Sequence, residues 1–141
     1  MRQKRKDRYV IPDPSTPERV EEIRRTYEEM FGVSISVKHT KLAVSELNPT
    51  QTELDADELE ERRLQVGEGS EEQIIVLEAL SRSKMPGRLI FFVLDGHHRL
   101  RSYKEKGVEE TIVYLLEPEN LLKTNLPEHL DIMQLPVVKR S

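Results

Sequence analysis

The stretch RLIFFVLDGHHRLRSYKEKG, residues 88–107, changes character at its centre. Its apolar run at residues 89–94 predicts a buried strand, and the residues after the run predict a short helix that ends at Gly107. The cluster DGHHR, residues 95–99, lies between strand and helix. A buried strand that ends in a compact group of polar and glycine positions indicates that a ligand docks at this turn.

Each residue type of the cluster suits an anion. Gly96 has no Cβ, so the backbone can approach a ligand closely at the strand-to-helix turn. A helix that begins near His97 points its first N–H groups and the positive end of its dipole at the same place. Arg99 and one or both of the imidazoles of His97 and His98 add donors and positive charge. The pattern predicts an anion site that is best suited to phosphate.

Three roles are open for the carboxylate of Asp95. It can cap the helix, hold a divalent cation such as Mg²⁺, or take a proton from an attacking hydroxyl. His97 and His98 have a structural alternative as hydrogen-bonded residues of the core. A zinc site is disfavoured because adjacent helical residues diverge by about 100°, and the other histidines, His39 and His129, lie in no ligand-spaced motif.

Length and composition limit the remaining classes. The 141 residues suffice for one domain, with 34% charged and 36% hydrophobic residues. The net charge of −4 provides no global attraction to nucleic acid. Because the chain has no cysteine, disulfides, thiol catalysis and Cys-ligated zinc are excluded. The absence of cysteine and of any apolar stretch of membrane-spanning length favours a cytoplasmic protein without a membrane partner.

The remaining patterns predict an α+β domain. Its small mixed sheet is flanked by helices, and the strands at residues 74–77 and 89–94 pair antiparallel across a short connection. Further elements are expected as one or two strands over 33–44, a helix from Asp55 to about Val66, a strand over 111–116, and a terminal helix or loop over 126–136. We place a basic tail and an N-terminal helix in residues 1–32 and the domain itself in residues 33–141.

The N-terminal region carries two further patterns. Ser15 or Thr16 can cap a helix whose apolar residues recur from Val20 to Phe31. That apolar stripe either packs on the body of the domain or forms a homodimer surface. The tail before it is either solvated or an arm that binds nucleic acid. Its basic residues are Arg2, Lys4, Arg5, Lys6 and Arg8.

Two motifs resemble the ParB/sulfiredoxin fold. LDGHHRL at residues 94–100 resembles the loop with which that family binds nucleotide phosphates, and VSELNPTQTELDADELEE at residues 44–61 resembles the ParB box. The resemblance covers roughly residues 41–117. It implies a nucleotide-binding domain to which Asn48 and Gln51 of the box also contribute. The sulfinic-acid repair of sulfiredoxins is excluded because this chain has no cysteine.

Within this group, the loop is most similar to that of the archaeal free serine kinases. The similarity implies that Gly96, His97, His98 and Arg99 hold the phosphates of ATP or ADP. Asp95 would then assist the acceptor hydroxyl or bind Mg²⁺. The catalytic residues implied by this similarity form a separate set. They are Asp95 together with Glu53 or Glu46, since Gln51 stands where those kinases carry a catalytic Glu and cannot act as a base.

The leading hypothesis is therefore a nucleotide-binding ParB/sulfiredoxin-like domain that transfers phosphate to a small hydroxyl-bearing substrate such as free serine. Two alternatives remain open. One is a ParB-like DNA-binding or nuclease module that contacts DNA through the N-terminal arm. The other is a non-enzymatic interaction domain that binds a nucleotide without turning it over.

Overall fold

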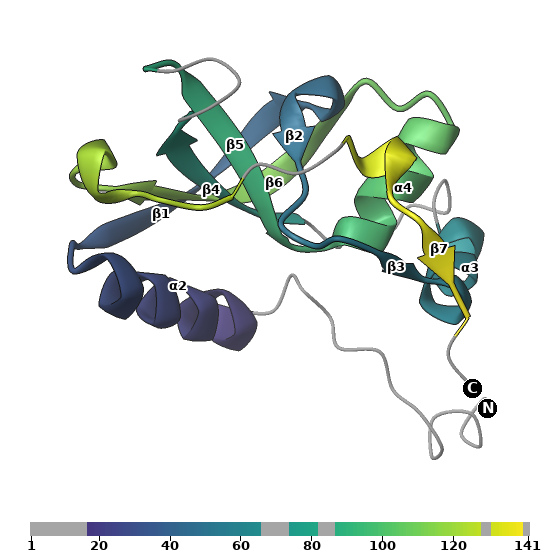
Figure 1. The fold of residues 1–141 in the computed structure, drawn as a ribbon, viewed down its shortest axis with the longest axis horizontal. Coiled ribbons are helices and arrows are strands. Elements are labelled where there is room, and N and C mark those ends of the chain that lie inside the picture. The colour runs from purple at the N-terminus through teal and green to yellow at the C-terminus, as the bar shows by residue number, and fades with distance from the viewer. Residues whose placement is uncertain (1–16, 66–73, 82–86, 128–130, 140–141) are drawn as a thin grey trace.

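The computed structural model describes residues 17–65, 74–81, 87–127 and 131–139 (Figure 1). The predicted basic tail at residues 1–8 and the predicted caps Ser15 and Thr16 lie outside the described residues, and so does His129. Among the described residues, no helix is long and apolar enough to cross a membrane.

The main sheet has five strands in the order β1-β6-β4-β5-β2. Antiparallel pairs join β1 to β6 and β4 to β5, whereas β4 pairs parallel with β6, and β2 with β5. The sheet is thus mixed, and the predicted antiparallel pair of strands is confirmed. The strands are β1 (Ile35–Ala43), β2 (Leu47–Asn48), β4 (Ile74–Leu80), β5 (Leu89–Asp95) and β6 (Glu110–Pro118). A second sheet pairs β3 (Leu54–Asp55) parallel with β7 (Val137–Val138).

The three predicted helices are present as α2 (Pro17–Phe31), α3 (Ala56–Gln65) and α4 (His97–Glu105) (Figure 1). Helix α3 begins where the capping pattern predicts, since the Asp55 carboxylate accepts a hydrogen bond from the Glu58 backbone N–H at 2.9 Å. The described residues also form three 3₁₀ turns: η1 (Val44–Glu46), η2 (Leu121–Lys123) and η3 (Ile132–Gln134). In the described part of the predicted terminal helix or loop, the chain forms the 3₁₀ turn η3, and β7 follows it.

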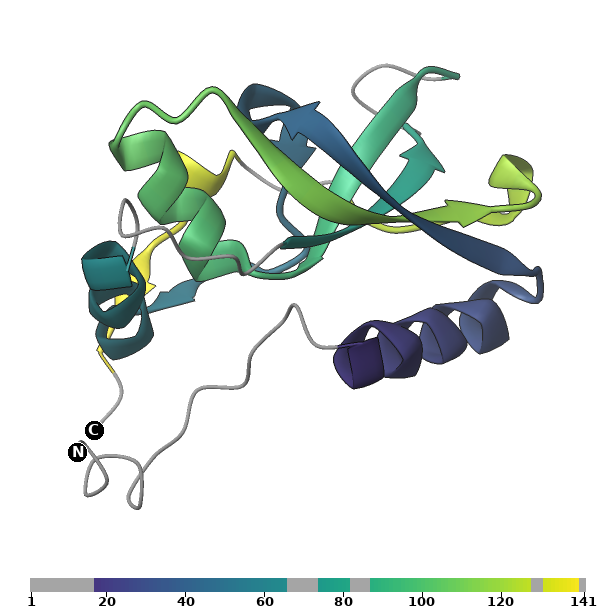
Figure 2. The ribbon, with the colours of Figure 1, turned by 180° about the vertical axis from the view of Figure 1, so that it is seen from behind.

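The sheet carries one core on each face. Alternate side chains of β4 enter the two cores, because successive strand residues point to opposite faces. The core beside α4 and η3 contains Val44, Leu47, Leu54, Ile74, Val76, Val93, Leu100, Val113, Leu115, Ile132 and Leu135. The core beside α2 contains Val20, Phe31, Ile35, Ile75, Leu77, Ala79, Ile90, Phe92 and Leu116. Figures 1 and 2 show α2 and α4 in separate places around the sheet.

Residues 33–44 form one strand and one 3₁₀ turn, and not two strands. Strand β1 lies at the edge of the sheet, so of its side chains only that of Ile35 is fully buried. The two-residue strands β2, β3 and β7 carry no pattern of their own, because alternation needs more than two positions to be recognised. The apolar stripe of α2 packs on the sheet through Val20 and Phe31, which agrees with the first of its two interpretations.

Candidate functional site

The candidate site lies at the turn between β5 and α4. Gly96 joins the two elements and has a φ of 105° and a ψ of 24°, in the left-handed region. A Cβ at this position would lie 3.1 Å from Cγ1 of Ile74 on the central strand β4. The left-handed backbone conformation therefore favours glycine here, and the packing against Ile74 leaves little room for a Cβ. Close approach of a ligand remains a prediction.

The start of α4 has no capping side chain. Gly96 is the N-cap residue, and no acidic residue stands in the first turn of the helix. The interpretation of Asp95 as the N-cap is therefore wrong, because the helix begins one residue too late for its side chain to cap it. The Asp95 carboxylate instead accepts a hydrogen bond at 2.9 Å from Nε of Arg19 on α2.

Both histidines of the cluster are buried and accept hydrogen bonds from backbone amides. Nε2 of His97 accepts from the N–H of Thr50 at 2.9 Å, and Nε2 of His98 accepts from the N–H of Asp55 at 2.8 Å. A backbone N–H can only donate, so both Nε2 atoms are unprotonated in this structure. In this structure both histidines are therefore hydrogen-bonded residues of the core, which is the structural alternative that the sequence left open.

These bonds hold the segment between β2 and β3 against the start of α4. Thr50 adds a third bond, from its hydroxyl to the carbonyl of Val93 on β5 at 2.7 Å. Nδ1 of His98 lies 3.5 Å from a carboxylate oxygen of Glu58. An Nε2 that accepts from an amide cannot donate to a phosphate at the same time. Direct phosphate contact through either Nε2, which stays a prediction, would require an exchange of partners.

The side chain of Arg99 points into the domain, where it is only 1% exposed. Its Nη1 donates to the hydroxyl of Tyr103 at 3.3 Å, and its guanidinium carbon lies 5.7 Å from the centre of the same ring. The phosphate contact that the kinase similarity implies for this side chain remains a prediction.

Arg19 is a member of the site that sequence reasoning missed. Its side chain is 39% exposed, and the Asp95 side chain is 25% exposed. The hydrogen bond with Asp95 raises the pKa of Arg19, and the negative charge of Asp95 adds to the effect. The two residues are 76 positions apart, so no local pattern could have paired them.

The residues of the ParB box occupy different positions around the turn. Nδ2 of Asn48 donates to the carbonyl of Phe91 at 3.3 Å and to that of Glu46 at 3.0 Å, so this amide helps to hold β2 beside β5. The side chains of Glu46 and Gln51 are exposed, and that of Glu53 is partly buried. Gln51 and Glu53 lie between the two amides that bond to the histidines, which places their segment beside α4.

The described residues contain no group of three or more His, Asp or Glu side chains that could bind a metal ion. They therefore give no support to a metal site made of protein side chains alone. Mg²⁺ is commonly bound through one or two carboxylates together with substrate phosphates. Asp95, next to the helix start, fits that second arrangement.

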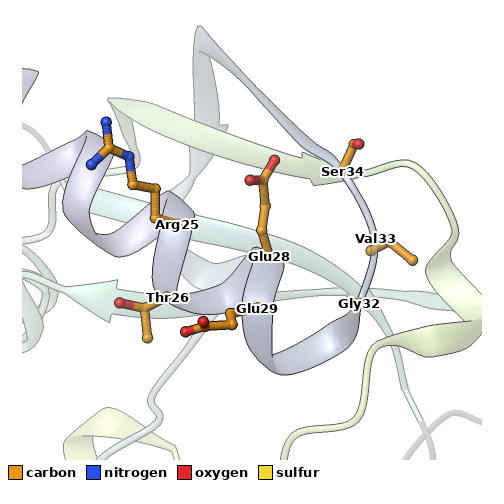
Figure 3. A pocket seen from close by; sticks show the side chains of 7 residues that line it. All are labelled: Arg25, Thr26, Glu28, Glu29, Gly32, Val33 and Ser34. Atoms are coloured by element: carbon orange, nitrogen blue, oxygen red, sulfur yellow. The ribbon is translucent and has the colours of Figure 1, made fainter.

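Two surface grooves lie away from these residues. One, of about 630 Å³, is at the C-terminal end of α2 (Figure 3). It is lined by Arg25, Thr26, Glu28, Glu29, Gly32, Val33 and Ser34. The other, of about 670 Å³, lies between η1, the end of α4 and η3, and Lys104 and Met133 are among its lining residues. Neither groove is lined by any of the predicted site residues.

The fold and the site define the class of protein: an α+β domain with a mixed sheet, in which a strand–glycine–helix turn is bonded to a second loop. Residues 40–135 match the family model described as "Putative ParB-like nuclease". The match covers more than half of the chain, and the chain belongs to this ParB-like family. The predicted resemblance is thereby confirmed at the level of the family.

The individual proteins that are similar to this chain include a curated relative and a solved structure. An uncharacterized protein, MJ0188, from Methanocaldococcus jannaschii is 28% identical over 123 residues, which are 87% of this chain and 44% of the relative. A crystal structure of protein Atu1540 from Agrobacterium tumefaciens aligns over 57% of this chain and 39% of its own, with 20% identity and a TM-score of 0.45. The chain thus spans less than half of the length of either protein.

Proposed function

We propose that this ParB-like domain binds the phosphate groups of a nucleotide, ATP or ADP, at the start of α4. The observation that carries the proposal is the uncapped first turn of that helix, which begins directly after Gly96 without an acidic residue. Partial positive charge at a helix N-terminus attracts phosphate. The partly exposed side chain of Arg19, which pairs with Asp95, brings guanidinium N–H donors beside the same turn.

In this proposal the histidines shape the site. The rings of His97 and His98 hold the amides of Thr50 and Asp55, which fixes the segment from Thr50 to Asp55 as one wall beside the helix start. A wall fixed before the ligand arrives lowers the entropy lost on binding.

The finer proposal is phosphoryl transfer to a hydroxyl such as that of free serine. Asp95 is the carboxylate nearest in sequence to the helix start, and it would either hold Mg²⁺ with the nucleotide phosphates or orient the acceptor hydroxyl. Its hydrogen bond to Arg19 keeps the carboxylate in place at the turn. Glu53 and Glu46 remain the candidates for the base.

The first experiment is calorimetric titration of the whole chain with ATP, ADP and CTP, each with and without Mg²⁺. The test variant is Asp95→Asn, and the matched control is Asp57→Asn, which changes an exposed aspartate on α3. If the phosphate binds beside Asp95, removal of this negative charge should tighten binding without Mg²⁺ and reduce the gain that Mg²⁺ provides. The control should change neither quantity.

Two results would decide against the proposal. One is a folded wild type that binds no nucleotide, and the other is binding that responds equally to both substitutions. If nucleotide binds but phosphate is never transferred across a panel of hydroxyl acceptors, the domain binds without catalysis, and the kinase step is withdrawn.

The family description favours a second candidate, in which the phosphate belongs to DNA. Phosphate contacts to DNA make affinity fall steeply with salt. Titration with a DNA duplex at two salt concentrations therefore distinguishes the two sources. Binding to DNA that weakens with salt and is lost on deletion of residues 1–8, without binding of free nucleotide, would replace the first candidate by the second.

A further inference from the structure

Strand β1 is an open edge of the main sheet. It runs in continuous register along β6, from Ile35 opposite Pro118 to Ala43 opposite Glu110. It is the last strand of the sheet on that side, and no described segment pairs with its other side. Figure 2 shows it as a long, twisted ribbon that accompanies β6. An unpaired strand edge presents a row of backbone donors and acceptors to a partner strand.

Contacts at Ile35 show which backbone groups face outward. Its N–H donates to a carboxylate oxygen of Glu28 at 2.8 Å, and its carbonyl accepts from Nη1 of Arg24 at 3.4 Å. Both partners are on α2 and not on β6. Because the N–H and C=O of every second residue point to the same side of a strand, Val37, His39, Lys41 and Ala43 also face outward. Helix α2 therefore closes only the beginning of this edge.

The sequence of β1 suits pairing. ISVKHTKLA contains no proline and no glycine, and it carries the β-branched residues Ile35, Val37 and Thr40. Val37 is 37% exposed. The open edge thus carries an apolar side chain that a second strand would partly cover.

We propose that β1 pairs with β1 of a second copy of this chain, antiparallel and centred on Thr40. A two-fold axis that brings the same edge of two copies together makes the strands antiparallel. Thr40 then lies opposite the partner's Thr40, and His39 lies opposite the partner's Lys41. Val37 meets the partner's Ala43. Every outward-facing residue after Ile35 then has a partner, and no two lysines lie opposite each other.

The neighbouring registers are each disfavoured by a named residue. If one strand slides by two residues in one direction, Ala43 lies opposite the partner's Ile35. The backbone groups of Ile35 are already bonded to α2. If one strand slides by two residues in the other direction, Lys41 lies opposite the partner's Lys41. Like charges directly opposite each other destabilise a strand pair.

The test introduces side chains of opposite charge at one position, His39. His39→Glu places a carboxylate opposite the partner's Lys41, and His39→Lys places an ammonium there. Each change occurs twice in a symmetric dimer. From typical cross-strand pair energies, we expect the dissociation constant to fall with Glu and to rise with Lys, in each case by roughly two- to thirtyfold. Sedimentation velocity over a concentration series of the whole chain measures the constant.

A charge exchange tests the register itself. The double variant combines His39→Lys with Lys41→Glu, so that in each of the two symmetric pairs an introduced ammonium lies opposite an introduced carboxylate. Dimerisation should then return towards that of the wild type. Circular dichroism of all variants checks that they fold. We expect them to fold, because the side chain of His39 is exposed. A wild type that remains monomeric at the highest soluble concentration overturns the proposal. So does a dimer whose dissociation constant responds in the same direction to both single substitutions of His39.

Discussion

Nε2 of His98 accepts a hydrogen bond from the backbone N–H of Asp55 at 2.8 Å, and this bond joins the start of α4 to the start of α3. The carboxylate of the same Asp55 accepts from the N–H of Glu58 and caps α3. His97 bonds in the same way to Thr50. The polar cluster that interrupts the sequence after β5 therefore organises two other segments of the chain as well as ending a strand.

The first prediction concerns this bond. His98→Ala removes the acceptor and leaves the amide of Asp55 without the ring that now bonds to it, so the free energy of unfolding should fall by about 1–3 kcal/mol. Urea denaturation followed by circular dichroism measures the change. Thr52→Ala, at an exposed position of the segment that the two histidines hold, is the control and should change stability by no more than about 0.5 kcal/mol. Equal losses in the two variants would show that the bond to Asp55 contributes little.

The second prediction compares two glycines with positive φ. Gly96→Ala should destabilise the protein more than Gly107→Ala, although both positions are left-handed, with φ values of 105° and 74°. The backbone strain of an alanine there is about 1–2 kcal/mol. At Gly96 the new Cβ would also press on Ile74, whereas nothing lies within 4 Å of a Cβ at Gly107. Thermal unfolding of both variants measures the difference, and a larger loss at Gly107 would contradict the packing argument.

The third prediction concerns pH. Hydrogen bonds from Arg63 and then from Arg101 lower the pKa of Glu105 below its ordinary value of 4.5. A lowered folded-state pKa stabilises the fold above the unfolded pKa, and that contribution is lost as the pH falls through the folded-state value. The difference in unfolding free energy between wild type and Glu105→Gln should therefore be largest near neutral pH and shrink below about pH 4.5.

Urea titrations of both proteins from pH 7 to pH 3 measure this difference. Because the other carboxylates titrate alike in the two proteins, their contributions cancel in the comparison. A difference that stays constant across the whole range would mean that Arg63 and Arg101 do not favour the charged form of Glu105.

The fourth prediction concerns the pair that joins α2 to the site. A double-mutant cycle of Arg19→Ala and Asp95→Ala should give a coupling energy of about 0.2–1 kcal/mol, because both side chains are partly exposed and the pair is screened by water. The coupling should weaken in high salt. A coupling of several kcal/mol, or one that does not respond to salt, would show that the pair is more deeply shielded than its exposure indicates.

The sequence determined those features that arise from near neighbours in the chain. The alternation and apolar runs of β4 and β5 predicted an antiparallel pair, and the Asp55–Glu58 spacing predicted the start of α3. Gly96 predicted the strand-to-helix turn. Together with the two ParB-like motifs, these local signals sufficed for the fold class and the family.

Only the tertiary structure decided the partners of the site residues. Asp95 bonds to Arg19, 76 positions away, and each histidine bonds to an amide more than 40 positions away. No periodicity records such pairs, because their geometry depends on how the sheet places α2 and the loop before β3 around α4. For the same reason the sequence left the histidines open between phosphate ligands and structural residues. Their burial and their bonds to backbone amides show the structural role.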